Sequence, residues 1–285
     1  MISILILTKN EEQDLPGCLA SVSWSDDVHV FDSFSTDRTV EIAEAAGAQV
    51  TQKKFDGYAS HRNAALAECA FKHPWVLILD ADERVPSPLH IEMIAAARGA
   101  SPSVSAFRIR RRDFFQGRWL KHAQMSPFYV RLIRVGRAHY EREVNEVLIV
   151  DGDVAELSEP FDHFPFSKGI RHWIEKHNVY STMEAQRWWD EQKGNFDFSW
   201  SKAVLSRDFS ERRYHQKGLF YRLPGRPLIK FAYMMILRRA FLDGGPGVTY
   251  AVLQSIYEYF IVLKQAELVR KLKADAGDEL NRMTG

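Results

Sequence analysis

One apolar run that ends in two aspartates constrains the fold of this chain more than any other stretch. Residues 75–79 are apolar and too few for a buried helix, so they predict a strand that is buried on both faces. Asp80 and Asp82 follow, and their carboxylates can share a face only if the chain stays extended or turns tightly. Carboxylate oxygens at the end of a strand suit Mg²⁺ or Mn²⁺, the usual partners of phosphate oxygens. The stretch therefore predicts either a metal site or a plain acidic turn.

Strand and helix patterns alternate four times through the first 80 residues. Such alternation predicts an α/β fold in three layers, with a mostly parallel sheet between helices. The other strand patterns are residues 2–8, 28–31, 48–51, 104–112, 128–134 and 147–150, and the helical patterns are residues 15–22, 36–46, 58–71 and 89–98.

Three polar residues end strands of this predicted sheet, namely Thr8, Asp32 and Asp80. Ligands of open α/β sheets bind beyond the carboxyl ends of the strands. The three positions therefore favour a ligand site over a plain acidic turn.

The pattern becomes helical in the last part of the chain. We expect helices at residues 169–189, 226–242 and 248–273, the last two separated by the strong breaker Asp-Gly-Gly-Pro-Gly at residues 243–247. The change predicts two domains, an α/β domain over residues 1–165 and a helical region over residues 166–285.

A basic and aromatic segment precedes the last helix. Between residues 205 and 240 there are nine lysines and arginines but only two acids, interleaved with phenylalanine, tyrosine and leucine. Such a segment suits the surface of an anionic membrane, and the alternative is an ordinary solvated face that packs on the first domain. Nucleic acid is a weaker candidate because no nucleic-acid-binding motif is present.

Charge, cysteine content and the lengths of the apolar runs indicate the cellular compartment in which the protein is expected. The net charge of +1 provides no strong overall field, so any preference for anions must be local. Two cysteines, Cys18 and Cys69, imply no disulfide framework and fit a reducing cytoplasm. The N-terminus enters a strand directly, without the features of a signal peptide, and no run reaches the ~20 apolar residues of a membrane-spanning helix.

The motifs taken together resemble a known family. Four segments in this order, residues 8–12 (TKNEE), 32–39 (DSFSTDRT), 62–66 (RNAAL) and 79–83 (LDADE), are similar to family 2 glycosyltransferases, which have the GT-A fold. Later segments resemble the bacterial lipopolysaccharide-core β-1,4-glucosyltransferase subfamily: residues 117–120, 131–132, 145–146, 163–164, 177–181 and 241–247. One departure is Asn145, where the subfamily usually has histidine, so a role that needs a titrating imidazole there is in doubt.

The resemblance implies inverting transfer of a sugar from a nucleotide diphosphate, and it implies roles for individual residues. Asp82 would bind the divalent cation, Mg²⁺ or Mn²⁺, with Asp80 helping directly or through the ribose. Glu146 would be the catalytic base that takes the proton of the acceptor hydroxyl, with Glu143 as second candidate.

The same resemblance implies a nucleotide site, for which plainer alternatives also stand. Asp32 would hydrogen-bond the uracil or ribose, or simply form a turn. Thr8 and Glu11 would line the nucleotide pocket, and Glu11 could instead be a first-turn helix acid. Arg62 would contact the base or phosphate and Arg131 the diphosphate, while a surface role for the first and a core-edge role for the second are the alternatives.

We therefore expect a cytoplasmic hexosyltransferase at the inner-membrane surface. The expected donor is UDP-glucose or a related UDP-hexose, and the expected acceptor is a lipid-linked saccharide such as a lipopolysaccharide core. A peptide or protein acceptor, and a nucleotide-sugar-binding module without catalysis, are the alternatives. The helical region could also support a homo-oligomer.

Overall fold

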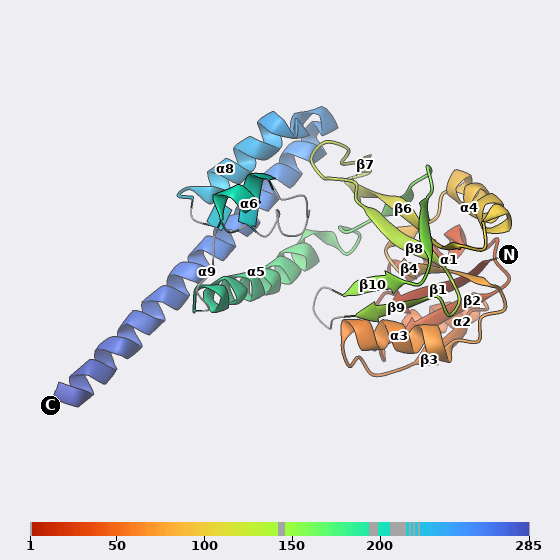
Figure 1. Cartoon of the computed structure of the whole chain (residues 1–285), viewed down its shortest axis with the longest axis horizontal. Helices are drawn as coiled ribbons and strands as arrows, with labels where there is room; N and C mark the ends of the chain where they lie inside the picture. The colour runs from red at the N-terminus through yellow and green to blue at the C-terminus, as the bar shows by residue number, and fades with distance from the viewer. Residues whose placement is uncertain are drawn as a thin grey trace. The chain divides into compact units, whose positions relative to one another are not determined.

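The computed structural model describes residues 2–141, 146–193, 199–205, 215–216, 218, 220–221 and 223–284 (Figure 1). The chain divides into two compact units. The first comprises residues 1–121 and 125–168, and the second comprises residues 122–124 and 169–285. The predicted boundary at residue 165 lies near this division, and the roles assigned to the two domains stay predictions.

The first unit contains the sheet and the helices α1 to α4. Its elements are β1 (Ile2–Thr8), α1 (Leu15–Ser21), β2 (Val28–Asp32), α2 (Thr39–Ala45), β3 (Gln49–Gln52), α3 (Tyr58–Glu68), β4 (Trp75–Asp80), β5 (Glu83–Arg84), α4 (Ser87–Gly99), β6 (Val104–Phe115), β7 (Arg118–Trp119), β8 (Phe128–Arg134), β9 (Ala138–Glu141), β10 (Val147–Val150), β11 (Asp153–Glu156) and β12 (Phe161–His163). The alternation predicted for the first 80 residues is confirmed, although α3 ends three residues before its predicted end.

Strand order places the sequence motifs at one edge of the sheet. The main path runs β3-β2-β1-β4-β8-β6-β12-β5, with β3, β2, β1 and β4 parallel and β8 antiparallel to β4 and β6. Thr8 of β1 lies opposite Asp32 of β2, and Leu7 of β1 lies opposite Asp80 of β4. The three polar residues predicted to end strands therefore lie at the same edge.

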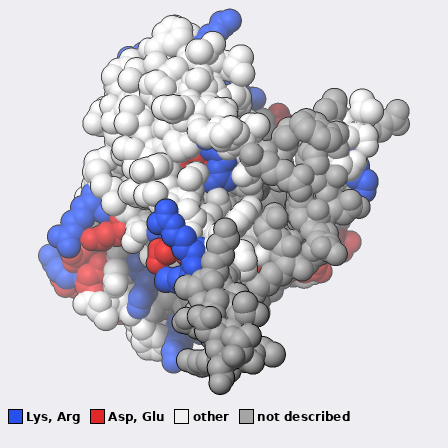
Figure 2. Space-filling model, turned by 90° about the vertical axis from the view of Figure 1, so that its left-hand side faces the viewer, with Lys and Arg blue, Asp and Glu red and all other residues white. Residues whose placement is uncertain are grey.

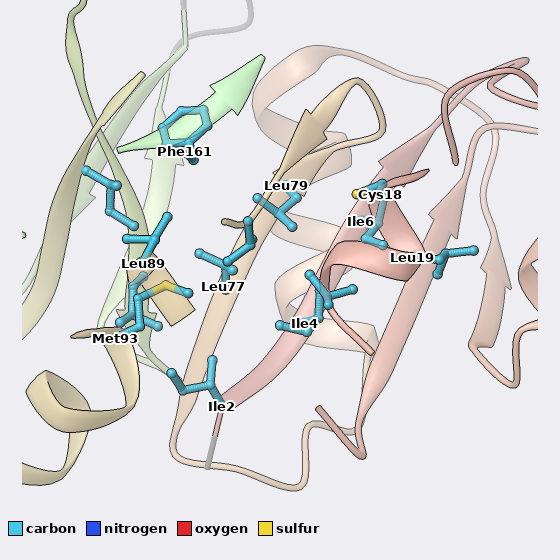
Figure 3. Packing of buried hydrophobic residues seen from close by; sticks show 14 of the residues in the cluster. Ile2, Ile4, Ile6, Cys18, Leu19, Leu77, Leu79, Leu89, Met93 and Phe161 are labelled. Atoms are coloured by element: carbon cyan, nitrogen blue, oxygen red, sulfur yellow. The ribbon is translucent and has the colours of Figure 1, made fainter. Parts of the chain in front are cut away.

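Alternate residues of the central strands supply two cores, one on each face of the sheet. On one face, Ile4 of β1 and Leu77 of β4 pack in a cluster with residues of α1, α2 and α4, including Leu89 (Figure 3). On the other face, Leu5 and Ile78 pack with residues of α3. This alternation follows from the two-residue period of a strand. The buried runs in β1 and β4 thus produce the predicted three-layer α/β arrangement.

The second unit is helical. It contains α5 (Gly169–Lys193), α6 (Trp200–Leu205), α8 (Arg226–Ala232), the π-helical turn η1 (Tyr233–Leu237), the 3₁₀ turn η2 (Ala240–Asp243) and α9 (Gly244–Thr284). None of the helices within the described ranges is long and apolar enough to cross a membrane.

The prediction of one regular helix over residues 226–242 was wrong. The α-helical hydrogen bonding ends at Ala232, and residues 233–237 form a π-helical turn. Arg239 then adopts a left-handed conformation with φ 57° before the 3₁₀ turn. Four of the five residues of the predicted breaker, 244–247, also lie inside the last helix, since α9 begins at Gly244. Gly247 is required in its first turn because a Cβ atom there would lie 2.1 Å from the carbonyl oxygen of Ala240.

Candidate active site

The carboxyl ends of β1 and β2 are joined through Asp32. The Oγ1 hydroxyl of Thr8 donates to Asp32 Oδ1 at 2.9 Å, and the Ser35 N–H and Gln52 Nε2 donate to Asp32 Oδ2 at 2.8 and 3.0 Å. Burial alone would raise the pKa of Asp32, but the hydrogen bonds, foremost those from Ser35, outweigh it and lower this pKa. The carboxylate therefore holds the loop after β2, and its predicted contact with the uracil or ribose stays a prediction.

Two arginines hold the first aspartate of the D-A-D motif. Arg62 Nη2 of α3 donates to Asp80 Oδ1 at 3.1 Å, and Arg131 Nη2 of β8 donates to Asp80 Oδ2 at 3.0 Å. Burial would raise the pKa of Asp80, but the charges of Arg131 and Arg62 overcome it and hold this pKa well below its usual range. Arg131 also pairs with the buried carboxylate of Glu83. Asp80 is therefore ionised and engaged on both oxygens.

The predicted base lies beside the same cluster. Glu146 Oε1 is 3.4 Å from Arg62 Nε, and the Glu146 side chain is 25% exposed. The ring of Tyr140 lies under the Arg62 guanidinium, 5.4 Å from its centroid. Glu146 is therefore both held by a cation and open to solvent. The other candidate base, Glu143, and the departure at Asn145 lie outside the described residues.

The second aspartate of the motif contacts a histidine. His163 Nε2 lies 3.2 Å from Asp82 Oδ2, and His163 Nδ1 is hydrogen-bonded to the buried Asp113. Burial would lower the pKa of His163, but hydrogen bonds to Asp113 and Asp82 raise it to about 9. The imidazole is therefore protonated near neutral pH and bridges two carboxylates.

Glu11 lies in the turn after β1. Its Oε1 accepts from Lys168 Nζ at 2.6 Å, whereas its Oε2 is buried without a hydrogen-bond partner in the described part of the chain. Burial raises the pKa of Glu11 to about 7 although Lys168 opposes this, and the charge of Asp82 adds to the rise. Glu11 and Asp82 are therefore near enough to influence each other electrostatically.

Donors for an anion remain available in the arginine cluster. Arg62 Nη1 and Arg131 Nε are buried and have no acceptor among the residues that the structure describes. An unpaired buried donor costs about 1–3 kcal/mol, so both atoms fit an incoming acceptor such as a phosphate oxygen.

The fit of a divalent cation differs between the two predicted ligands. Across the described ranges, no group of three or more His, Cys, Asp or Glu side chains is arranged to hold a metal ion by itself. Both oxygens of Asp80, whose side chain is 37% exposed, accept from guanidinium groups, whereas the Asp82 side chain, which is 29% exposed, contacts the imidazole of His163. Mg²⁺ is commonly held by one or two carboxylates together with substrate phosphates and water. Asp82 fits such a site, and the metal-ligand role of Asp80 stays a prediction.

The structure brings most of the predicted site residues together and adds others. Asp80, Arg62, Arg131 and Glu146 form one connected cluster, and Thr8 and Asp32 form a second group. Sequence reasoning did not include His163, Asp113 and Lys168 among the site residues. One signal for Asp113 was present, since it lies in phase with Ile109 and Phe115, the inward-facing residues of β6.

The comparisons with known proteins agree with the motifs. The family model described as "Glycosyl transferase family 2" matches residues 3–154. The lipopolysaccharide core biosynthesis glycosyltransferase LpsC of Rhizobium meliloti is 29% identical over 196 residues, which is 65% of this chain and 71% of LpsC. An uncharacterized glycosyltransferase of Rickettsia bellii is 42% identical over 93 residues, and this match covers 32% of the chain and only 31% of that protein.

A solved structure shows a weaker likeness. Glucosyl-3-phosphoglycerate synthase from Mycobacterium tuberculosis, solved with Mn²⁺, UDP-glucose and phosphoglyceric acid, has 25% identity and a TM-score of 0.34, covering 39% of this chain and 44% of that one. A TM-score of this size reflects only partial overlap of the two folds.

The family model covers more than half of the chain, and the sheet order and flanking helices have the architecture that the motifs predicted. The α/β fold of the GT-A type with a helical C-terminal region is thereby confirmed. The chain belongs to glycosyl transferase family 2.

Proposed function

We propose that this glycosyltransferase moves a hexose, glucose in the first instance, from a UDP-sugar to a lipid-linked saccharide, with inversion at the anomeric carbon. The observation that carries the proposal is the cluster at the carboxyl edge of the sheet. There two guanidinium groups have buried donors without an acceptor among the described residues, beside the carboxylates of Asp80 and Glu146. The likeness to LpsC supports a lipopolysaccharide core as the acceptor.

The arginines would bind the leaving group. Negative charge grows on the diphosphate as the bond to the sugar breaks, and preorganised cations stabilise such charge. Arg62 Nη1 and Arg131 Nε are the donors available for it. Asp80 would keep the two guanidinium groups in place, because its oxygens bind both of them.

A divalent cation, Mg²⁺ or Mn²⁺, would be held by Asp82, with Asp80 as the further predicted ligand. When bound, it would add positive charge at the diphosphate. Thr8, Glu11 and Asp32 would shape the nucleoside end of the pocket, where Thr8 and Asp32 already fix the loop after β2.

Glu146 would act as the base. The acceptor hydroxyl oxygen attacks the anomeric carbon, the bond from that carbon to the diphosphate oxygen breaks, UDP leaves with the bonding electrons, and the hydroxyl proton passes to Glu146. The contact with Arg62 would hold the Glu146 carboxylate in position. A peripheral position at the cytoplasmic face of the inner membrane would bring this base to a lipid-linked acceptor.

A screen of UDP-sugars tests the proposal without knowledge of the acceptor. We expect one UDP-hexose to bind the full-length protein by calorimetry and to be hydrolysed slowly when Mn²⁺ or Mg²⁺ is present. Arg62→Met should weaken this binding, whereas Arg137→Met should not, because Arg137 pairs with Asp151 at an exposed site. Absence of binding for every UDP-sugar with either metal would overturn the proposed donor class.

A further inference from the structure

The continuous helical segment formed by α8 and η1 exposes its apolar side. Two rows of residues at four-residue spacing, namely Leu228, Ala232 and Ile236 beside Ile229, Tyr233 and Leu237, are all exposed. Leu228, Ile236 and Leu237 are 75%, 70% and 72% exposed. We call these six residues the apolar ridge. A solvent-facing helix surface normally carries polar residues, whereas this one carries apolar residues.

The opposite side of the same segment holds it to the second unit through polar contacts. Arg226 is 3% exposed, donates from Nη2 to Gln265 Oε1 at 2.6 Å and lies 3.3 Å from Glu258 Oε1. The Ser255 hydroxyl donates to the carbonyl oxygen of Pro227 at 2.6 Å. Met234 is also buried on this side. The segment is therefore anchored to α9 without using the apolar ridge.

The segment that carries the apolar ridge has charges of one sign. Residues 223–242 contain four basic residues and no acid. Of the four, Arg226 is buried, whereas Arg239 is exposed and Lys230 and Arg238 are half-buried. The next acid, Asp243, is buried and accepts from the N–H groups of His122 and Ala123. Figure 2 shows a broad uncharged surface at the height of α8 in Figure 1.

This charge pattern discriminates between two occupants of the apolar ridge. A second copy of the chain in a symmetric contact would place the same patch against itself. The arginines of both copies would then lie in one interface, and the segment supplies no acid to offset them. Anionic lipid headgroups complement the arginines, while the acyl region accepts the apolar side chains.

We propose that the apolar ridge inserts into the surface of an anionic membrane, with Lys230, Arg238 and Arg239 at the headgroups. The segment would lie in the plane of the interface as an amphipathic helix does. The purpose of this insertion rests on the proposed function, since insertion would hold the enzyme where a lipid-linked acceptor is found. The surface itself is defined by exposure and charge alone.

Vesicle binding by the full-length protein tests the proposal. We expect co-sedimentation with vesicles of phosphatidylcholine and phosphatidylglycerol, and at least about tenfold weaker binding to phosphatidylcholine alone. The triple variant Leu228→Ser, Ile236→Ser, Leu237→Ser should lose on the order of 100-fold in binding. The matched control Ile174→Ser, Val179→Ser, Met183→Ser changes exposed residues of α5 and should bind like the wild type.

A fluorescent label locates the contact. Cys18 and Cys69 are buried, so a cysteine introduced by Ile236→Cys can be labelled selectively with an environment-sensitive dye. We expect its emission to shift to the blue with anionic vesicles, and we expect no shift for the same dye after Val179→Cys. Equal shifts at both positions would overturn the proposal.

The remaining outcomes separate this inference from the proposed function. If the Leu228, Ile236 and Leu237 variant binds vesicles as tightly as the wild type, the apolar ridge has no role in membrane binding. If the wild type is a dimer and the variant is a monomer with unchanged vesicle binding, the ridge is a contact between copies of the chain and the proposal is overturned. UDP-sugar hydrolysis in solution should be the same for the variant and the wild type. Vesicle binding without any UDP-sugar hydrolysis would contradict the proposed function and leave the membrane surface supported.

Discussion

The carboxyl edge of the sheet and helix α8 each bury an arginine, but different chemistry is exposed beside it. At the edge, Arg131 is 7% exposed between Asp80 and Glu83, and the partly exposed Asp82 lies nearby in the same turn. At α8, Arg226 is 3% exposed against Gln265, and the exposed neighbours are leucine and isoleucine.

The difference shows that a buried charge does not by itself mark a functional site. Charged residues are rarely buried unless they are paired, and both arginines satisfy that rule. Their surroundings differ because Arg131 pairs with Asp80, whose side chain is 37% exposed, whereas Arg226 ties down a helix whose outer face is apolar. Function is therefore inferred from the exposed residues beside a buried arginine and not from the arginine itself.

The largest expected effect is at Glu146, because it tests whether the sheet edge performs chemistry. Glu146→Gln removes the proton acceptor but keeps the shape of the side chain, so transfer should fall by about 10²–10⁴-fold. UDP-sugar affinity, measured by calorimetry, should change little. Glu156→Gln, at an exposed pair with Arg108, is the matched control. Full activity in Glu146→Gln would remove this residue from the base role.

The second prediction sharpens the comparison of the two arginines through the free energy of unfolding. Arg131→Met leaves the buried Glu83 without its cation and should destabilise the protein by about 3–5 kcal/mol. Arg226→Met loses one carboxylate and one amide contact and should cost about 1–3 kcal/mol. Chemical denaturation followed by circular dichroism measures both. Equal losses would show that the two sites are energetically alike.

The third prediction concerns the cation at the sheet edge. Removal of divalent metal by EDTA, or the substitution Asp82→Asn, should weaken metal-dependent UDP-sugar binding by about 100-fold. Asp151→Asn changes an acid that is 77% exposed and should leave binding unchanged. Activity that survives EDTA would rule out the metal, and charge stabilisation would then fall to the two arginines.

The smallest expected effect is at Asp27, a buried carboxylate in the loop before β2. Burial would raise its pKa, but hydrogen bonds from the Ser3 hydroxyl and the Lys72 N–H lower it. Because the folded pKa lies below the ordinary value of about 4, the stabilisation is complete above that value and is lost as the pH falls from there through the lower folded pKa. Asp27→Asn should make the loss of stability in acid smaller by about 1 kcal/mol, measured as the change in the free energy of unfolding with pH. An unchanged pH profile would contradict the assignment.

The positions of β1 to β4 and the edge of the sheet that holds the candidate site were predictable because they depend on local patterns, whereas the short strands β5, β7, β9, β11 and β12 were not predicted. Residues 75–80 form a buried strand as expected, and Thr8, Asp32 and Asp80 lie at one edge since parallel strands end together. The partners of the charges were not predictable. Arg62 and Arg131 are 18 and 51 residues from Asp80, and nothing local specifies which cation an aspartate will meet.

By itself, the sequence determined the alternating α/β layers, the family and the set of candidate acids, because apolar periodicity and short motifs act over a few residues. Only the tertiary structure decided that Asp80 is held by two arginines, that Asp82 contacts His163, and that the apolar side of α8 faces outward. Helical periodicity defines two faces but does not determine which one meets the protein. That choice depends on contacts such as Arg226 with Gln265, which form only when distant segments pack together.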